Sequence, residues 1–182
     1  MTQPATTTAS DPAADAVAVR HAAPADLGDI LAIYNDAVVN TTAIWNDNTV
    51  DLAERQGWYD SRMSLGCPVL VATHNDTVLG YASYGPFRPF EGFRGSRELS
   101  VYVAATARGR GVGRRLLRAL IDEATARGVH VLIAGIEAGN GASIALHAAA
   151  GFAETGRMPE VGQKFGRYLD LVFMQLRLPR RD

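Results

Sequence analysis

Hydrophobic and polar residues alternate along this chain with two different periods, which predict strands and helices in turn. A period of two is typical of a half-buried strand, whereas apolar residues three and four positions apart mark one face of a helix. Asp51, followed by Glu54, forms a capping box that begins a helix, and Gly66 ends it. The predicted strands cover residues 17–21, 69–73, 78–84, 98–103, 129–136, 152–155 and 168–178, and the predicted helices cover residues 24–40, 51–66, 112–127 and 142–150.

The order of these elements predicts an α/β or α+β fold with a mixed sheet. The helix over residues 112–127 lies between two strands, which is the pattern of a parallel crossover connection. The turn at residues 74–76 has a composition typical of an antiparallel hairpin. We expect one domain over residues 17–178, between a disordered tail at residues 1–16 and a short tail at residues 179–182.

A glycine-rich turn joins the strand at residues 98–103 to the helix at residues 112–127. The helix has an apolar face that runs to a stop at Gly128. Because the first amides of a helix lack intrahelical partners and the helix dipole is positive at that end, such a turn can bind a phosphate. The residues of the apolar face are Val112, Leu116, Leu117, Leu120, Ile121 and Ala124, and those of the turn are Arg108, Gly109, Arg110, Gly111, Val112 and Gly113.

The spacing in this turn excludes the two common nucleotide motifs. A dinucleotide-binding turn would have glycine at the position of Arg114, and a Walker loop would contain Gly-Lys-Ser/Thr. What remains is Arg/Gln-x-x-Gly-x-Gly/Ala, satisfied by Arg108, Gly111 and Gly113. A tight connection with solvated arginines is the alternative interpretation.

Composition and charge narrow the classes of partner. The 182 residues are 47% hydrophobic and carry a formal net charge of −1, so we expect no nucleic-acid partner. The single cysteine, Cys67, precludes an internal disulfide and is expected to be a buried structural thiol, and no metal site is expected. With neither a signal peptide nor a membrane span in the sequence, we expect a cytoplasmic protein with no membrane partner.

The motif at residues 108–113 resembles the pyrophosphate loop of the GCN5-related N-acetyltransferases (GNAT), which bind acetyl-coenzyme A (acetyl-CoA). Asn140, Ser143 and the Gly-Phe pair at residues 151–152 are similar to a later strand-loop-helix of that family, with His147 at a position where tyrosine is usual. The strand beginning at Glu98 and the segment 162–170 resemble the phosphinothricin and methionine sulfoximine/sulfone branch. The resemblance implies about four helices around a mostly antiparallel sheet with a splayed parallel pair, and a homodimer.

Acetyl transfer needs a base, a donor to the thioester oxygen and a proton for the departing thiolate. The resemblance implies that Glu98 is the base, although a solvated Glu98 paired with an arginine is the alternative. His147 or Tyr102 could protonate the thiolate. The residues expected to bind acetyl-CoA are Val101, Tyr102, Val103, Arg108, Gly109, Arg110, Gly111, Val112, Gly113, Asn140 and Ser143.

A broken loop after the strand at residues 78–84 carries three phenylalanines and two arginines. An arginine can bind the carboxylate of an amino-acid acceptor in bidentate fashion, while aromatic side chains enclose its side chain. We favour Arg88 over Arg94 as that cation, and a dimer contact or a hydrophobic lid is the other interpretation of the loop. The residues expected to bind the acceptor are Arg88, Phe90, Glu91, Gly92, Phe93, Arg94 and Trp45.

These features favour an acetyl-CoA-dependent N-acetyltransferase of the α-amine of a small amino-acid analogue: methionine sulfoximine, methionine sulfone or phosphinothricin. Two alternatives remain open. The acceptor could be another amine, such as a peptide N-terminus, a polyamine or an antibiotic, although an arginine-rich loop suits cationic acceptors less well. The chain could also be a non-catalytic acetyl-CoA sensor.

Overall fold

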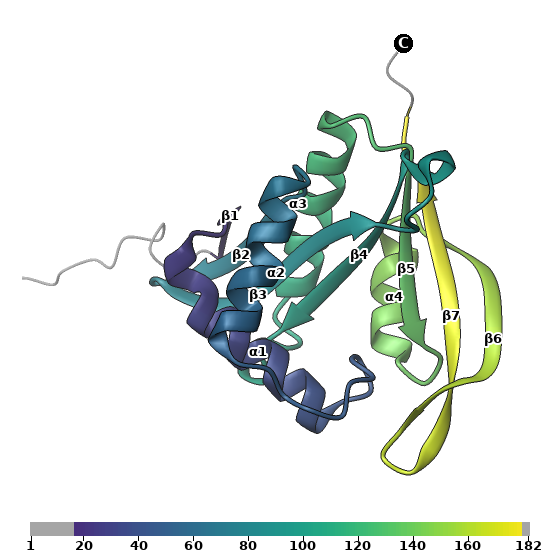
Figure 1. The fold of residues 1–182 in the computed structure, drawn as a ribbon, viewed down its shortest axis with the longest axis horizontal. Coiled ribbons are helices and arrows are strands. Elements are labelled where there is room, and N and C mark those ends of the chain that lie inside the picture. The colour runs from purple at the N-terminus through teal and green to yellow at the C-terminus, as the bar shows by residue number, and fades with distance from the viewer. Residues whose placement is uncertain (1–16, 180–182) are drawn as a thin grey trace, which may run out of the picture.

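A seven-stranded mixed sheet forms the centre of the protein in the computed structural model, which describes residues 17–179 (Figure 1). The strand order is β1-β2-β3-β4-β5-β7-β6, and β4 and β5 form its parallel pair. The expected tail at residues 1–16 and most of the one at residues 179–182 lie outside the described residues. The strands are β1 (Ala18–His21), β2 (Val69–His74), β3 (Thr77–Pro86), β4 (Ser96–Val103), β5 (Val131–Glu137), β6 (Ala153–Lys164) and β7 (Arg167–Arg177).

Four α-helices cover the two faces of this sheet. One face carries α1 (Leu27–Asn40) and α2 (Leu52–Ser64), and the other carries α3 (Val112–Ala126) and α4 (Gly141–Ala149) (Figure 1). Each pair buries its own hydrophobic cluster against the strands. Three short 3₁₀ helices occupy the connections, at Pro24–Asp26, Glu91–Phe93 and Ala105–Ala107. The described residues contain no helix that is both long and apolar enough to cross a membrane.

Local signals in the sequence account for where the helices begin and end. The Asp51 side chain accepts a hydrogen bond from the Glu54 amide at 2.9 Å, as a cap of α2. Gly128 follows α3 with φ of +71°, the left-handed conformation that glycine adopts without strain. The predicted apolar face of α3 is confirmed: five of its six residues are buried, Ile121 being the partly buried exception.

The parallel pair β4–β5 separates almost as soon as it forms. Its register pairs only Ser96–Glu98 with Val131–Ile133, and beyond these residues the two strands diverge. Because β4 stays paired with β3 along residues 97–103, one edge of its second half is bonded and the other is open. The expected mixed sheet with a splayed parallel pair is confirmed.

The predicted short strand at residues 152–155 is wrong in length, because β6 extends to Lys164. Gly156, Pro159 and Gly162 interrupt the hydrophobic pattern there, and most of the strand is exposed. The strand persists because it pairs with β7, with irregularities between Glu154 and Gly156 and between Met158 and Gly162. The length of β6 is set by its pairing with β7, and this pairing cannot be predicted from the local hydrophobic pattern.

Candidate functional site

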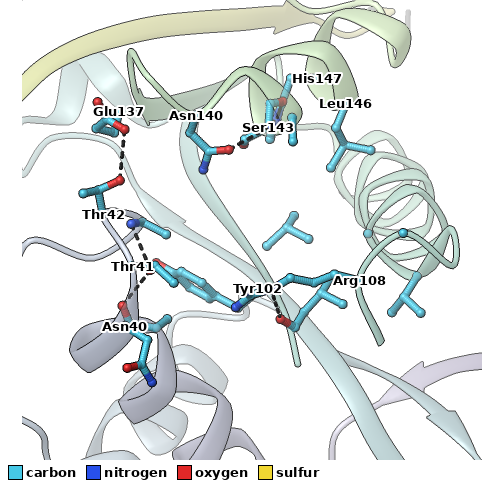
Figure 2. A pocket seen from close by; sticks show the side chains of 18 of the residues that line it. Asn40, Thr41, Thr42, Tyr102, Arg108, Glu137, Asn140, Ser143, Leu146 and His147 are labelled. Atoms are coloured by element: carbon cyan, nitrogen blue, oxygen red, sulfur yellow. Dashed lines mark hydrogen bonds between the residues drawn. The ribbon is translucent and has the colours of Figure 1, made fainter. Parts of the chain in front are cut away.

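A cleft of about 840 Å³ opens where β4 and β5 separate (Figure 2). It is bounded by the C-terminal end of α1, the second half of β4, the N-terminal end of α3, and α4. All but one of the residues expected to bind acetyl-CoA line this cleft, and Arg110 is the exception. The expected residues in the lining are Val101, Tyr102, Val103, Arg108, Gly109, Gly111, Val112, Gly113, Asn140 and Ser143.

One end of the cleft is formed by the N-terminal end of α3. Gly111 precedes the helix with φ of +79°, and the amide of Arg115 donates to the Gly111 carbonyl at 3.2 Å. The amides of residues 112–114 precede that bond and therefore have no acceptor within the helix. A Cβ on Gly113 would lie 3.3 Å from a methyl of Leu146, so a side chain here would require Leu146 to shift, and glycine leaves this floor of the cleft open. The end of the cleft suits a phosphate-containing group.

A narrower cavity of about 80 Å³ continues from the cleft between the diverging strands. It is lined by residues 99–102 of β4 and residues 134–137 of β5, and it shares Asn140, Ser143 and His147 with the larger cleft. Because the edge of β4 that faces β5 is open, its backbone groups are available to a ligand. The two cavities together can accommodate a long ligand that has its anionic end at α3.

Glu98 lies on β4 where the parallel pair is still closed, and its side chain is half-buried. Burial raises the pKa of this carboxyl, and the positive charge of Arg88 partly opposes that effect. A Cβ on Gly135 would lie 3.4 Å from Glu98 Oε1, so that glycine leaves room for the carboxylate beside β5. Its environment is therefore that of a general base and not of a fully solvated charge.

His147 is buried in the wall shared by the two cavities. Its Nδ1–H donates to the Ser143 carbonyl at 2.8 Å, and its Nε2 has no hydrogen-bond partner among residues 17–179. Burial lowers the pKa of the imidazole, which is therefore neutral at pH 7, with its one proton already donated. This arrangement does not suit the expected role of proton donor to a thiolate.

Tyr102 lines both cavities and packs against Tyr81, with ring centroids 5.2 Å apart. Burial raises the pKa of the Tyr102 hydroxyl, so it keeps its proton throughout the physiological range. Of the two expected proton donors, Tyr102 therefore fits the role better. Asn140, which also lines both cavities, caps α4, because its Oδ1 accepts a hydrogen bond from the Ser143 amide.

A bridge across the cleft was not expected from the sequence. The Thr42 hydroxyl, from the loop after α1, donates to Glu137 Oε2 at 2.9 Å (Figure 2). Glu137 Oε1 accepts from the Gly139 amide at 2.8 Å. The sequence did offer one signal for this contact: Glu137 is a carboxylate directly after a predicted strand, two residues before the pair Gly139-Asn140. Arg114, Phe165 and Arg167 also line the cleft without having been predicted.

The residues expected to bind the acceptor do not line either cavity. Phe90 is 69% exposed and Phe93 is 40% exposed, and the guanidinium of Arg88 lies 4.2 Å from the centroid of its neighbour, Phe87. Trp45 packs its ring against Gly162 on β6, where a Cβ would collide with it. Glu91, Gly92 and Arg94 are exposed. Two of these residues have an indirect link to the site: the charge of Arg88 acts on Glu98, and the Trp45 indole N–H donates to the carbonyl of Thr42, which lines the cleft.

The splayed strands, the glycine turn at the start of α3 and the half-buried Glu98 carboxyl are compatible with group transfer from a phosphate-bearing donor. The family model described as Acetyltransferase (GNAT) family matches residues 30–152. The chain therefore belongs to this family and is an acetyltransferase, which confirms the resemblance. Residues 17–179 contain no group of three or more His, Cys, Asp or Glu side chains that could hold a metal ion.

Within that family, the chain is 62% identical over 161 residues to the L-methionine sulfoximine/L-methionine sulfone acetyltransferase of Pseudomonas paraeruginosa, with 88% of this chain and 94% of that protein covered. It is 53% identical over 165 residues to an L-amino acid N-acyltransferase of Escherichia coli, with 91% and 96% covered. A solved structure of a phosphinothricin acetyltransferase from Sinorhizobium meliloti in complex with acetyl-CoA has a TM-score of 0.87 and 37% identity, with 89% of this chain and 88% of that one covered.

Proposed function

We propose that residues 17–178 form an acetyl-CoA-dependent N-acetyltransferase domain that acts on the α-amine of a small amino-acid analogue. The observation that carries the proposal is Glu98, a half-buried base where the parallel pair is closed, at the end of the sheet opposite the glycine floor of α3. The identity of 62% with a methionine sulfoximine/sulfone acetyltransferase supports these two compounds as the acceptors. Phosphinothricin is a further acceptor of the same chemical kind.

The residues of the cleft fit acetyl-CoA as the donor. The free amides of residues 112–114 and Arg108, whose Nε donates to the Val103 carbonyl at 3.3 Å, would bind its pyrophosphate. The open edge of β4 would bind the pantetheine arm. Bound acetyl-CoA supplies an activated acetyl group as a thioester.

The side chains of the site divide the proton transfers between them. Glu98 accepts a proton from the ammonium of the acceptor, directly or through water, and leaves a neutral nitrogen. An amide on the open edge of β4 donates to the thioester oxygen while the N–C bond forms and the C–S bond breaks. The Tyr102 hydroxyl gives its proton to the departing thiolate and regains one, through water, from the nitrogen as the amide forms, and the neutral His147 keeps the wall beside it uncharged.

Arg88 is the cation we propose for the carboxylate of the acceptor, since its charge acts on Glu98. We expect Arg88→Ala to raise the KM for methionine sulfone by ~10–100-fold, as a charge-assisted bond is lost, with little change in the KM for acetyl-CoA. Arg94→Ala is the matched control, because Arg94 is exposed on the same loop. Thiol release from acetyl-CoA measures both constants. Equal effects of the two substitutions would contradict the assignment of Arg88.

A panel of acceptors tests the proposed function itself. Methionine sulfoximine, methionine sulfone, phosphinothricin, ordinary L-amino acids, peptides and polyamines are each compared with a reaction lacking acceptor. We expect the sulfoximine or the sulfone to have the highest kcat/KM. A broad response to L-amino acids would favour the second candidate, a general L-amino acid N-acyltransferase, which the identity of 53% with that enzyme supports. Tight acetyl-CoA binding without turnover would indicate a sensor.

We also propose that the protein is a homodimer. Among the large apolar side chains that are exposed, Phe90 and Phe93 lie on the loop after β3, and Met158, Val161 and Tyr168 lie on the β6–β7 hairpin. Since β6 is an edge strand of the sheet, a second copy could cover both its edge and these side chains. Light scattering after gel filtration should give twice the monomer mass, and Val161→Glu should reduce it to that of a monomer. A wild-type monomer at micromolar concentration would refute this proposal.

A further inference from the structure

Lys164 is the single lysine in a chain of 182 residues that otherwise uses 17 arginines as its cations. It is the last residue of β6, and it is only 3% exposed. Its Nζ donates hydrogen bonds to the carbonyls of Val38 and Ile44. Burying a charged ammonium costs free energy unless hydrogen bonds replace those it made to water, so a buried lysine is rare.

The two carbonyls that accept from Lys164 belong to segments that are far from β6 in the sequence, 126 and 120 residues away. Val38 is in the last turn of α1, where carbonyls have no helical partner and a cation is favoured by the helix dipole. Ile44 is in the loop that follows α1. The ammonium also lies 4.9 Å from the centroid of the Phe165 ring. Burial lowers the pKa of the ammonium, and the negative charge of Asp47 partly opposes this.

The loop that Lys164 holds carries side chains of the cleft and of its rim. The Thr42 hydroxyl donates to Glu137 in the wall of the cleft, and the Trp45 indole N–H donates to the Thr42 carbonyl at 2.9 Å. Trp45 in turn packs against Gly162, two residues before Lys164. The loop after α1 and the end of β6 therefore form one contact unit, with the ammonium at its centre.

The turn after Lys164 is also part of the cleft. Phe165 and Gly166 connect β6 to β7 with φ of +51° and +72°, a left-handed pair in which a bulky residue is unfavourable. Phe165 and Arg167 nevertheless line the cleft. The hydrogen bonds of Lys164 connect this strained turn to α1 and to the loop after it, and the turn completes that wall of the cleft.

We propose that Lys164 is a positioning residue for the acceptor: it fastens the β6–β7 turn to the loop after α1, and so sets the wall of the cleft that Thr42, Phe165 and Arg167 form and that we assign to the acceptor. This inference rests on the proposed function. Lys164 lines neither cavity, and Arg108, which we propose for the pyrophosphate, lies across the cleft from Thr42 and Glu137 (Figure 2), so we expect the effect of Lys164 to fall mainly on the acceptor. A compact ammonium can converge on two carbonyls in a small space, which the larger planar guanidinium does less well.

Lys164→Met, which keeps the length of the stem and removes the charge, tests this role. We expect the KM for methionine sulfone to rise by ~10–100-fold, the effect of a displaced substrate-positioning group, while the Kd for acetyl-CoA changes by less than about twofold. Lys164→Arg should recover part of the loss. Arg157→Met is the matched control, because it removes an exposed cation from the same strand. A lower melting temperature with unchanged KM values, or equal loss for both substrates, would overturn the proposal.

Hydrogen exchange separates this inference from the proposed function. In Lys164→Met, and not in Arg157→Met, amides of residues 41–47 should exchange at least about tenfold faster than in the wild type. This holds even if the wild type fails to acetylate methionine sulfone, a result that would refute only the proposed acceptor. Unchanged exchange in Lys164→Met would overturn the positioning role.

Chemical labelling covers the case in which Lys164→Met does not fold. Lys164 is the single lysine in the sequence, so an acylating reagent can modify only Lys164 and the α-amine. The rate of modification of Lys164 can therefore be measured in the wild-type protein, without any substitution. Peptide masses distinguish the two. We expect Lys164 to react at least ~100-fold more slowly than the α-amine, because its ammonium is buried and bonded. Labelling at a similar rate would overturn the proposal.

Discussion

Glu98→Gln is expected to lower kcat at pH 7 by about 10²–10⁴-fold, the usual contribution of a general base. The acceptor's amine has a pKa near ~8 and is mostly protonated at neutral pH, so a group must accept its proton before attack. Glutamine keeps the shape of the side chain beside Gly135 and removes only this capacity. Steady-state thiol release at several pH values measures the loss, with the Kd for acetyl-CoA as a control that should not change.

The dependence of activity on pH should differ between the wild type and Glu98→Gln. A base works when it is deprotonated, so wild-type activity should fall as the pH drops through the raised pKa of Glu98. Glu98→Gln should lack that limb and regain relative activity above pH ~9, where more of the amine is neutral. A variant with wild-type turnover at every pH would show that Glu98 is not the base.

Stability provides a second check on Glu98→Gln. Because burial raises the pKa of Glu98 above its unfolded value, the folded state binds this proton more tightly, and the stabilising effect is lost as pH rises through the folded pKa. Removing the charge should therefore leave the melting temperature at pH 7 no lower than that of the wild type. A large drop would indicate that Glu98 has a structural role, and the loss of activity could then not be assigned to catalysis.

The part of the cleft that we assign to acetyl-CoA was predictable because its determinants are local in sequence. A strand, a glycine turn and a helix follow one another within residues 98–127, and the geometry of a helix start dictates what that turn can bind. The apolar face of α3 and the cap at Asp51 are local in the same sense. Patterns of this kind are read from neighbouring residues, and the structure places nearly all of them as expected.

The part of the site that we assign to the acceptor depends on contacts between distant segments, which a hydrophobic pattern does not encode. Lys164 reaches Val38 and Ile44 from 126 and 120 residues away, and Thr42 reaches Glu137 over 95 residues. The extent of β6 likewise depends on β7. The aromatic loop was expected to enclose the acceptor because of its composition, yet Phe90 and Phe93 are exposed. Composition indicated the chemistry of that loop and not its position.

The protonation state of His147 also could not be predicted from the sequence. Its position in the sequence suggested a proton donor, and the structure does place it in the wall of the cleft. Its protonation state, however, is set by burial and by the bond of Nδ1 to the Ser143 carbonyl, neither of which can be read from the residue type. The role of a titratable group thus depends on its environment, and here that environment favours Tyr102.

Gly113→Val should raise the Kd for acetyl-CoA by about 10²-fold or more, with a smaller effect on the KM for the acceptor. A Cβ at this position would already lie 3.3 Å from Leu146 and 3.6 Å from Val103, so the two methyls of valine must either displace α4 or enter the cleft over the amides of residues 112–114. Both outcomes remove donors from the pyrophosphate. Titration calorimetry with acetyl-CoA in the absence of acceptor measures the loss directly.

Gly57→Val is the matched control for Gly113→Val. Gly57 lies within α2, where an added Cβ meets nothing within 4 Å, so the substitution makes the same chemical change in a helix away from the cleft. It should leave acetyl-CoA binding unchanged, whereas Gly113→Ala should have an intermediate effect, because one methyl is accommodated by a shift of the Leu146 side chain. Wild-type affinity in Gly113→Val would show that the ligand does not bind over the start of α3, and the anion site would then have to lie elsewhere in the cleft.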